Sequence, residues 1–237
     1  MASLLENKTI NGVCRVRLTP RQNDCSFLAG ANSYTLDSPL ELSITPEAGS
    51  VGEIEKEKLN GVKCFYRPET SYVKSLTIAG KFCEFCPDAF AEFFGWNTYI
   101  GGGDNYAIGM PVGVNNNTAC APTGVDKFSM EIIAPVAATG GICTSTTGAY
   151  VKIIVPVMFN VMPGELPFAN DDTLDFSFTA SAVGDNGTYG NGPFNDFGGG
   201  TGTVLENDGL IIENLPVGFT MPAASCTPTP VPTQAGA

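Results

Sequence analysis

The stretch most like a ligand-binding loop is rich in glycine. Residues 183–204, VGDNGTYGNGPFNDFGGGTGTV, contain eight glycines, and glycine-rich loops can cradle phosphates through their backbone amides. A phosphate-binding loop also needs a Gly-Lys-Ser/Thr sequence that opens a helix. This stretch has no lysine, no helical pattern follows it, and the last basic residue before it is Lys152. A phosphate there would meet carboxylates, so the residues exclude a nucleotide site; the acids are Asp185, Asp196, Glu206 and Asp208.

Oxygen-bearing side chains offer a second kind of chemistry. Asp185, Asn186 and Asn191 carry oxygens that suit calcium, but the ligand spacing of an EF-hand is missing, and the same residue types form turns. A carboxylate cluster at Asp171, Asp172 and Asp175 has the alternative interpretation of a turn followed by the head of a strand. The patterns favour turns, and we expect neither a metal nor a cofactor.

The chain has eight cysteines and no histidine. Only Cys83 and Cys86 have a CxxC spacing. A zinc site would need a second ligand pair, and a thioredoxin-like redox pair would need a βαβ context, which is missing although a helical pattern follows. The opening residues show no signal peptide, so we expect synthesis in the cytoplasm and buried, reduced thiols. Without histidine, nothing obvious activates the hydroxyls of residues 139–148, and we expect no enzymatic activity.

The charge balance excludes further classes of function. The chain has 237 residues, with 24 acids against 12 bases and a net charge of −12, which argues against a surface that grips nucleic acid through its phosphates. No stretch approaches the ~18 apolar residues of a membrane span. The sequence after Lys152 holds nine acids and no base. Three bases lie together near the start, which suits head-to-tail contacts between copies of the chain; these are Arg15, Arg17 and Arg21.

Alternating apolar residues predict a mainly β fold. A strand is expected over residues 33–46, with Pro46 and Gly49 as its stop. Turn residues separate these segments at intervals typical of a β-sandwich or barrel. The other strands are expected over residues 62–68, 72–82, 127–136, 149–163, 171–183 and 209–216.

One short helix is expected over residues 87–94, with Pro87 at its first position and Gly95 after its end. Its apolar stripe, which includes Phe90, Phe93 and Phe94, is predicted to pack on the sheet. The chain is interpreted as a single β-rich domain over residues 1–221. The Pro- and Thr-rich tail, residues 222–237, cannot form a core and is expected to rest on a neighbouring copy.

Several motifs, in order, resemble a known family. The segment GTYGNGPFNDF (residues 187–197), after the strand TLDFSFTASA, resembles the WGxGPY segment of major tail tube proteins of long-tailed bacteriophages, particularly those that infect actinobacteria. The strand-then-helix segment SLTIAGKFCEFCPDAFAEFFGW and the paired strands MEIIAPV and AYVKIIVPVMFNVMPGEL are also similar to the family's. The match covers roughly residues 33–213. Thr188 and Tyr189 stand in place of the usual Trp, and Phe194 in place of Tyr.

The resemblance implies a β-sandwich with one short flanking helix and a long β-hairpin that joins neighbouring copies. Such subunits assemble into hexameric rings that stack as the virion's tail tube, an acidic-walled channel through which double-stranded DNA passes without specific binding. The implied partners are other copies, the tape measure protein, and the distal tail and tail terminator proteins, with no membrane. The alternatives are a surface-binding β-sandwich, of the fibre or carbohydrate-binding kind, and another hexameric tail component such as a terminator.

The segment SVGEIEKEKLNGVKCFY (residues 50–66) supports two interpretations. As a strand it places Glu53, Glu55 and Glu57 on one face. The opposite face then carries Ile54, Lys56 and Lys58. As a solvated helix it would run from residue 53 to 60 with Gly61 as its cap. The family resemblance favours the hairpin, in which the glutamates face the lumen and the opposite face contacts the adjacent copy.

Overall fold

The structure, a computed structural model, is mainly β with one short helix among the residues it describes. These residues are 12–21, 32–37, 39–57, 63–83, 86–100, 106–110, 127–136, 149–165, 175–184, 208–215 and 219–230. The helix α1 spans Pro87–Phe94. The strands are β1 (Arg15–Arg21), β2 (Asn32–Leu36), β3 (Glu41–Val51), β4 (Ile54–Glu57), β5 (Lys63–Arg67), β6 (Thr70–Phe82), β7 (Asn97–Ile100), β8 (Tyr106–Gly109), β9 (Lys127–Pro135), β10 (Tyr150–Pro163), β11 (Phe176–Val183), β12 (Ile211–Asn214) and β13 (Ser225–Pro230).

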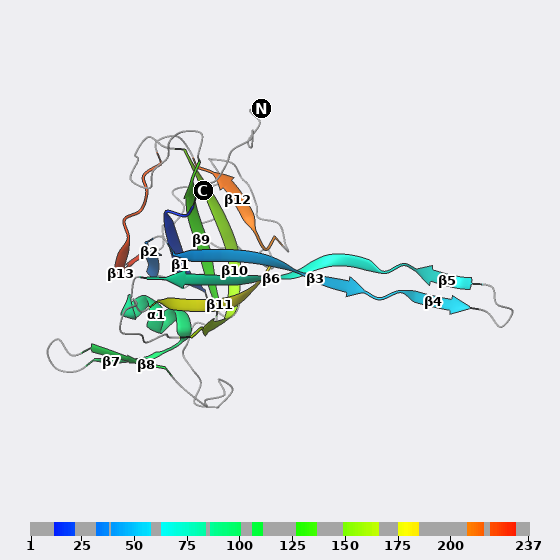
Figure 1. Cartoon of the computed structure of the whole chain (residues 1–237), viewed down its shortest axis with the longest axis horizontal. Helices are drawn as coiled ribbons and strands as arrows, with labels where there is room; N and C mark the ends of the chain where they lie inside the picture. The colour runs from blue at the N-terminus through cyan, green and yellow to red at the C-terminus, as the bar shows by residue number, and fades with distance from the viewer. Residues whose placement is uncertain are drawn as a thin grey trace.

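Nine strands form one antiparallel sheet in the order β13-β2-β1-β9-β10-β11-β6-β3, with β12 also paired to β10. The sheet branches at β10, because residues 151–154 of this strand pair with β12 and residues 157–163 pair with β11. Figure 1 shows the result: β3, β6 and β11 run across the steep strands β1, β9 and β10. The sheet therefore folds over itself and buries a core between its two halves, as in an orthogonal sandwich.

The core follows from the period-2 patterns in the sequence. Every second residue of β6 from Leu76 to Phe82 is buried, and the same alternation runs through β11 from Phe176 to Ala182. Because successive side chains of a strand point to opposite faces, each strand contributes one apolar row. These rows meet the inner rows of β1, β9 and β10, which are Val16, Leu18, Phe128, Met130, Ile132, Val155 and Met158.

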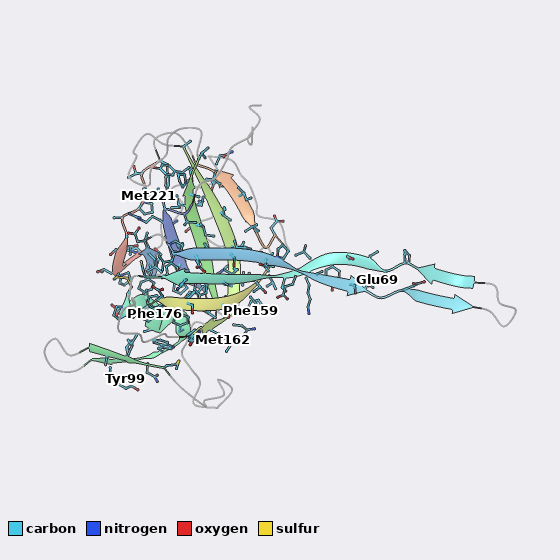
Figure 2. The ribbon with its side chains drawn as sticks, in the orientation of Figure 1. Glu69, Tyr99, Phe159, Met162, Phe176 and Met221 are labelled. Carbon is cyan, nitrogen blue, oxygen red and sulfur yellow. A yellow bond between two sulfur atoms is a disulfide. The ribbon has the colours of Figure 1, made fainter. Side chains whose placement is uncertain are left out.

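Helix α1 covers an open side of this core. Proline stands at its start, and Gly95 ends it in the left-handed conformation, at a φ of 65°, where glycine has no Cβ penalty. Phe93 packs edge-on against Phe178, with 5.1 Å between ring centroids, and Phe90 packs on Phe176 at 4.9 Å, as Figure 2 shows for Phe176 beside the helix. Phe94 is half-buried and stacks on Phe90. The sequence pattern therefore placed the helix and its apolar face well.

The strand expected over residues 33–46 is wrong in two respects. It is two strands, β2 and β3, which lie far apart in the sheet. The second one does not stop at Pro46 but continues to Val51. A proline is tolerated there because β3 is an edge strand, where a missing N–H interrupts no ladder. The sequence patterns did not predict β1, β7, β8 and β13.

Two hairpins project beyond the main sheet (Figure 1). We call residues 47–75 the arm: it comprises the outer halves of β3 and β6 and, further out, β4 paired with β5. The second hairpin, β7–β8, follows α1 directly and forms its own two-stranded sheet. Within the part of the chain that the structure describes, no helix is both long enough and apolar enough to span a membrane.

Candidate functional site

The described residues contain no candidate metal site. Across these ranges, no three His, Cys, Asp or Glu residues are grouped so that they could hold a metal ion. Asp175 is buried, forms an ion pair with Lys81 at 2.7 Å and stands directly before β11, which fits the structural interpretation of that residue. Asp171, Asp172 and the glycine-rich residues 185–204 lie outside the described residues. The feature that needs a functional explanation is the arm.

The arm leaves the body at a β-bulge. Glu47 pairs with Ser75 and Ala48 pairs with Val73, so Lys74 is the extra residue. A bulge of this kind bends the strand and increases its twist. Beyond it, every residue of β6 from Thr70 to Lys74 is exposed, whereas the alternation of buried residues resumes from Leu76. This stretch of β6 therefore contributes no buried side chain to the core of the body.

Polar contacts fix the root of the arm. The Thr77 hydroxyl donates a hydrogen bond to one carboxylate oxygen of Glu47, and the Ser75 hydroxyl donates to the other at 3.3 Å. These hydroxyls, Thr77 foremost, lower the pKa of Glu47 below its usual value, because they stabilise the charged carboxylate. Gly49 lies under the Tyr72 ring, so that a Cβ at residue 49 would come within 2.7 Å of it. The side chains at the root thus hold the two strands in register.

The outer part of the arm is a hairpin, not a helix. The register runs from Ile54 opposite Arg67 to Glu57 opposite Lys63. The strand interpretation of residues 54–57 is therefore confirmed, and the helical alternative is wrong there, because these residues hydrogen-bond to a second strand instead of to their own turn. Lys58 lies outside the described residues.

The predicted lumen-facing row is only partly placed. Glu53 is exposed at the junction between β3 and β4, while Glu55 and Glu57 lie on β4. Ile54 and Lys56, predicted to contact the adjacent copy, lie on the same strand. The backbone positions fit the predicted alternation, and the direction in which these residues face within an assembly stays a prediction.

The surface of the arm differs from that of the remaining chain in charge. Residues 47–75 hold five acids and five bases, so the other residues hold nineteen acids against seven bases. The whole net charge of −12 therefore falls outside the arm. The arm also exposes two large apolar side chains, since Tyr72 is 52% and Val73 is 64% exposed. A charge-balanced, partly apolar hairpin thus extends from a strongly acidic chain.

The arginines predicted to contact neighbouring copies lie instead in the middle of the sheet, on β1. Arg21 is fully buried and donates a hydrogen bond to the carbonyl of Pro156 at 2.7 Å. Its predicted inter-subunit role is therefore wrong for this conformation. Arg15 forms an ion pair with Asp37, and Arg17 pairs within the subunit as well. Arg15 and Arg17 are thus already paired with acids of their own chain, and their contact with a neighbouring copy stays a prediction.

Arg17 belongs to a partly buried network of four charges that was not predicted from the sequence. Its guanidinium donates to Glu131 at 2.7 Å; Lys152 lies 3.7 Å from Glu131 and 2.8 Å from Glu213. The register places Arg17 opposite Glu131 and Lys152 opposite Glu213. The network therefore spans β1, β9, β10 and β12, and it serves to pair the charges that these strands bury. Single charges inside the apolar runs MEIIAP and YVKIIV were the signal for it.

The cysteines correct a further expectation. Cys86 is bonded to Cys226, 140 residues away, and Cys14 is disulfide-bonded too, so these residues are not reduced thiols. Cys83 is free and exposed. The partner of Cys86 lies in β13, which pairs with β2 of the same chain. Residues 225–230 of the tail therefore rest on their own subunit, whereas residues 231–237 lie outside the description.

Comparisons with known proteins leave the family open. No protein-family model matches the chain, and the search of curated proteins finds no significant match either. The assignment of function therefore depends on the arm, the charge distribution and the motifs in the sequence.

Proposed function

We propose that the chain is a structural virion protein that polymerises as stacked hexameric rings into the tail tube of a long-tailed bacteriophage. The tube would form an acidic-walled channel for DNA ejection. The observation that carries this proposal is the arm. Every residue of β6 from Thr70 to Lys74 is exposed, and a lone two-stranded hairpin is marginally stable in water. An arm of this kind gains stability when it packs on another chain, and further copies of the same chain are the simplest partner.

The charges support association between copies as well. Bodies that carry the whole net charge of −12 repel one another. The arm holds five of the twelve bases, including Lys56, Lys63 and Lys74, and it can therefore approach an acidic neighbour without repulsion. The same acidic surfaces disfavour DNA phosphates, which suits a channel that DNA slides through.

The proposed assembly involves the family's other tail proteins. Copies of the chain would contact each other within and between rings, and the tube would meet the tape measure, distal tail and terminator proteins at its interior and ends. In this assembly Glu53, Glu55 and Glu57 face the lumen. Replacing all three by lysine is expected to leave tube formation intact and to slow DNA ejection, because the wall would then attract phosphate; unchanged ejection would contradict the lumen assignment.

The test of the whole proposal is microscopy of purified protein with and without the arm. Ser50 and Ser71 are directly opposite in the ladder, so an Asn-Gly turn can replace residues 51–70 without a change of register. We expect the wild-type chain to form hollow tubes or six-fold rings in negative stain. The shortened chain is expected to stay monomeric in light scattering. Its circular dichroism signal, divided by the number of strand residues, should equal that of the wild type, which would show that the body still folds.

A matched control shortens the other hairpin. Ile100 and Tyr106 are also opposite each other, so residues 101–105 can be replaced by the same turn. This variant is expected to assemble like the wild type. Assembly of the arm-shortened chain would contradict the role of the arm. Wild-type monomers that bind a glycan array would favour the surface-binding alternative, for which exposed Tyr99 on β7 would supply an aromatic platform (Figure 2).

A further inference from the structure

The C-terminal strand β13 is held weakly by its backbone. It pairs with β2 on one side, through Ser225 opposite Thr35 and Thr229 opposite Ser33, with a register shift between the two pairs. Two of its six residues, Pro228 and Pro230, have no N–H to donate. Most of the strand is exposed, and its side-chain bonds to β2 join Ser33 and Thr229 at 3.2 Å or more. The covalent tie to Cys86 is therefore the strongest restraint on β13.

That tie joins the strand to the start of the helix. Cys86 is the N-cap residue of α1, is buried, and accepts a hydrogen bond from the Phe90 amide at 2.9 Å. Its Cα lies 5.1 Å from that of Cys226, which is exposed in β13. One partner of the disulfide is thus fixed in the core, and the other belongs to an exposed edge strand.

A free thiol lies near Cys86 in the sequence. Cys83 is exposed, follows β6 directly and precedes Cys86 by three residues. Three residues span at most about 11 Å when fully extended, and cysteines at this spacing form the disulfide of CxxC redox proteins. Cys83 therefore has the spacing and the exposure needed to attack the bond that holds β13.

We propose that Cys83 moves the disulfide from Cys86–Cys226 to Cys83–Cys86 by thiol–disulfide exchange and thereby releases β13. The Cys83 thiol loses its proton to solvent, and its thiolate sulfur attacks the Sγ atom of Cys86. The Cys86–Cys226 bond breaks, and Cys226 leaves as a thiolate that takes a proton from water. One disulfide and one thiol are present before and after, so the step needs no oxidant or reductant.

Release of β13 changes what the sheet presents to other chains. The outer edge of β2, residues 32–36, loses its partner. Its free N–H and C=O groups can then pair with a strand from another chain. This inference does not depend on the proposed function, because it concerns the bonds within one chain.

The test is a map of the disulfides in the intact, oxidised chain. The protein is held between pH 6.5 and 8, quenched with acid, alkylated and digested. Trypsin leaves Cys86 in residues 82–127 and Cys226 in residues 153–237, and cleavage after Glu84 separates Cys83 from Cys86. We expect peptides that join Cys83 to Cys86, together with alkylated Cys226. Their rate of formation should rise about 25-fold over this pH range, as the thiolate fraction of an ordinary cysteine does, since the thiolate is the nucleophile.

The matched control is Cys83→Ser, which removes the nucleophile at an exposed position. It is expected to keep only the Cys86–Cys226 bond at every pH and to show slower hydrogen exchange of the β13 amides than the wild type. A rate that does not depend on protein concentration identifies the exchange as intramolecular. The proposal is overturned if the wild type retains only Cys86–Cys226, or if Cys83 becomes joined to Cys226, because β13 would then stay tied.

Discussion

The body and the arm share two strands, β3 and β6, yet only the body has a core of its own. In the body, β6 alternates between buried and half-buried residues, and in the arm the same strand is exposed at every residue from Thr70 to Lys74. The change occurs at the bulge at Lys74. The inner half of the β3–β6 ladder is thus stabilised by burial in the body. The outer half, in the arm, depends for its stability on packing against another chain.

The two regions also differ in how they use charge. The body buries Glu131 between Arg17 and Lys152, where loss of one partner leaves an uncompensated buried charge. The arm root keeps Glu47 in solvent, bonded to hydroxyls. Substitutions in the body should therefore affect folding, while those in the arm should affect assembly.

The largest expected effect is loss of a core ring. Phe178 stacks on Phe82, packs against Phe93 and is buried, so Phe178→Ala should lower the free energy of unfolding by about 3–5 kcal/mol. Tyr72→Ala in the arm should change it by less than about 0.5 kcal/mol. Urea unfolding of both variants measures the difference; equal effects would contradict the division into body and arm.

Removal of the buried carboxylate should have the next largest effect. Glu131→Gln leaves Arg17 and Lys152 without their shared acid and should cost about 3 kcal/mol. Glu69→Gln, at an exposed position in the arm that Figure 2 labels, is the control and should be near neutral. Thermal unfolding at constant pH compares them. A neutral Glu131→Gln would mean that the network does not stabilise the sheet.

Substitution of two glycines, one in the body and one in the arm, should have a smaller effect on stability. A Cβ at residue 80 would lie 2.4 Å from the buried Phe178 ring, whereas a Cβ at residue 52, in the arm, meets nothing within 4 Å. Gly80→Ala should destabilise by about 1–3 kcal/mol through overpacking, and Gly52→Ala should be tolerated. Chemical denaturation with an unchanged m-value would show that the loss is in native packing and not in the unfolded chain.

The smallest effect concerns pH at the arm root. Because hydroxyl donors lower the pKa of Glu47 in the folded chain, its contribution is fully present above the pKa of an unfolded glutamate and is lost as the pH falls through the lower, folded value. The protection of the arm amides against hydrogen exchange, corrected for the intrinsic exchange rate, should therefore fall only as the pH drops below the pKa of an unfolded glutamate. Thr77→Val removes the main donor, and it should raise the pKa of Glu47 in an NMR titration.

Sequence patterns predicted the elements whose structure is determined by neighbouring residues. The period-2 rows of β6, β9, β10 and β11 were readable because one or both of their faces are buried, and Pro87 and Gly95 marked the ends of the helix. The strand in residues 54–57 was one of two interpretations, because alternating charges suit a solvated helix and an exposed strand equally.

Features that depend on contacts between distant parts of the chain could not be predicted from the sequence. β13 contains prolines and no apolar row, and only its pairing with β2 and the bond from Cys226 to Cys86 make it a strand. The three arginines of β1 looked like surface charges, because nothing local indicates that Glu131 and the Pro156 carbonyl lie beside them. Edge position likewise allowed β3 to continue through Pro46.

The length of the arm has a geometric consequence. From Ala48 to Glu57 it covers ten residues, which at about 3.3 Å per residue gives a reach of roughly 30 Å. That distance is about the diameter of a small domain. In the proposed ring, a hairpin of this span would extend over much of the surface of the adjacent subunit. Each copy in the proposed ring would then be held by its own arm and by the arm of a neighbour, so that removal of one subunit would require several contacts to open together.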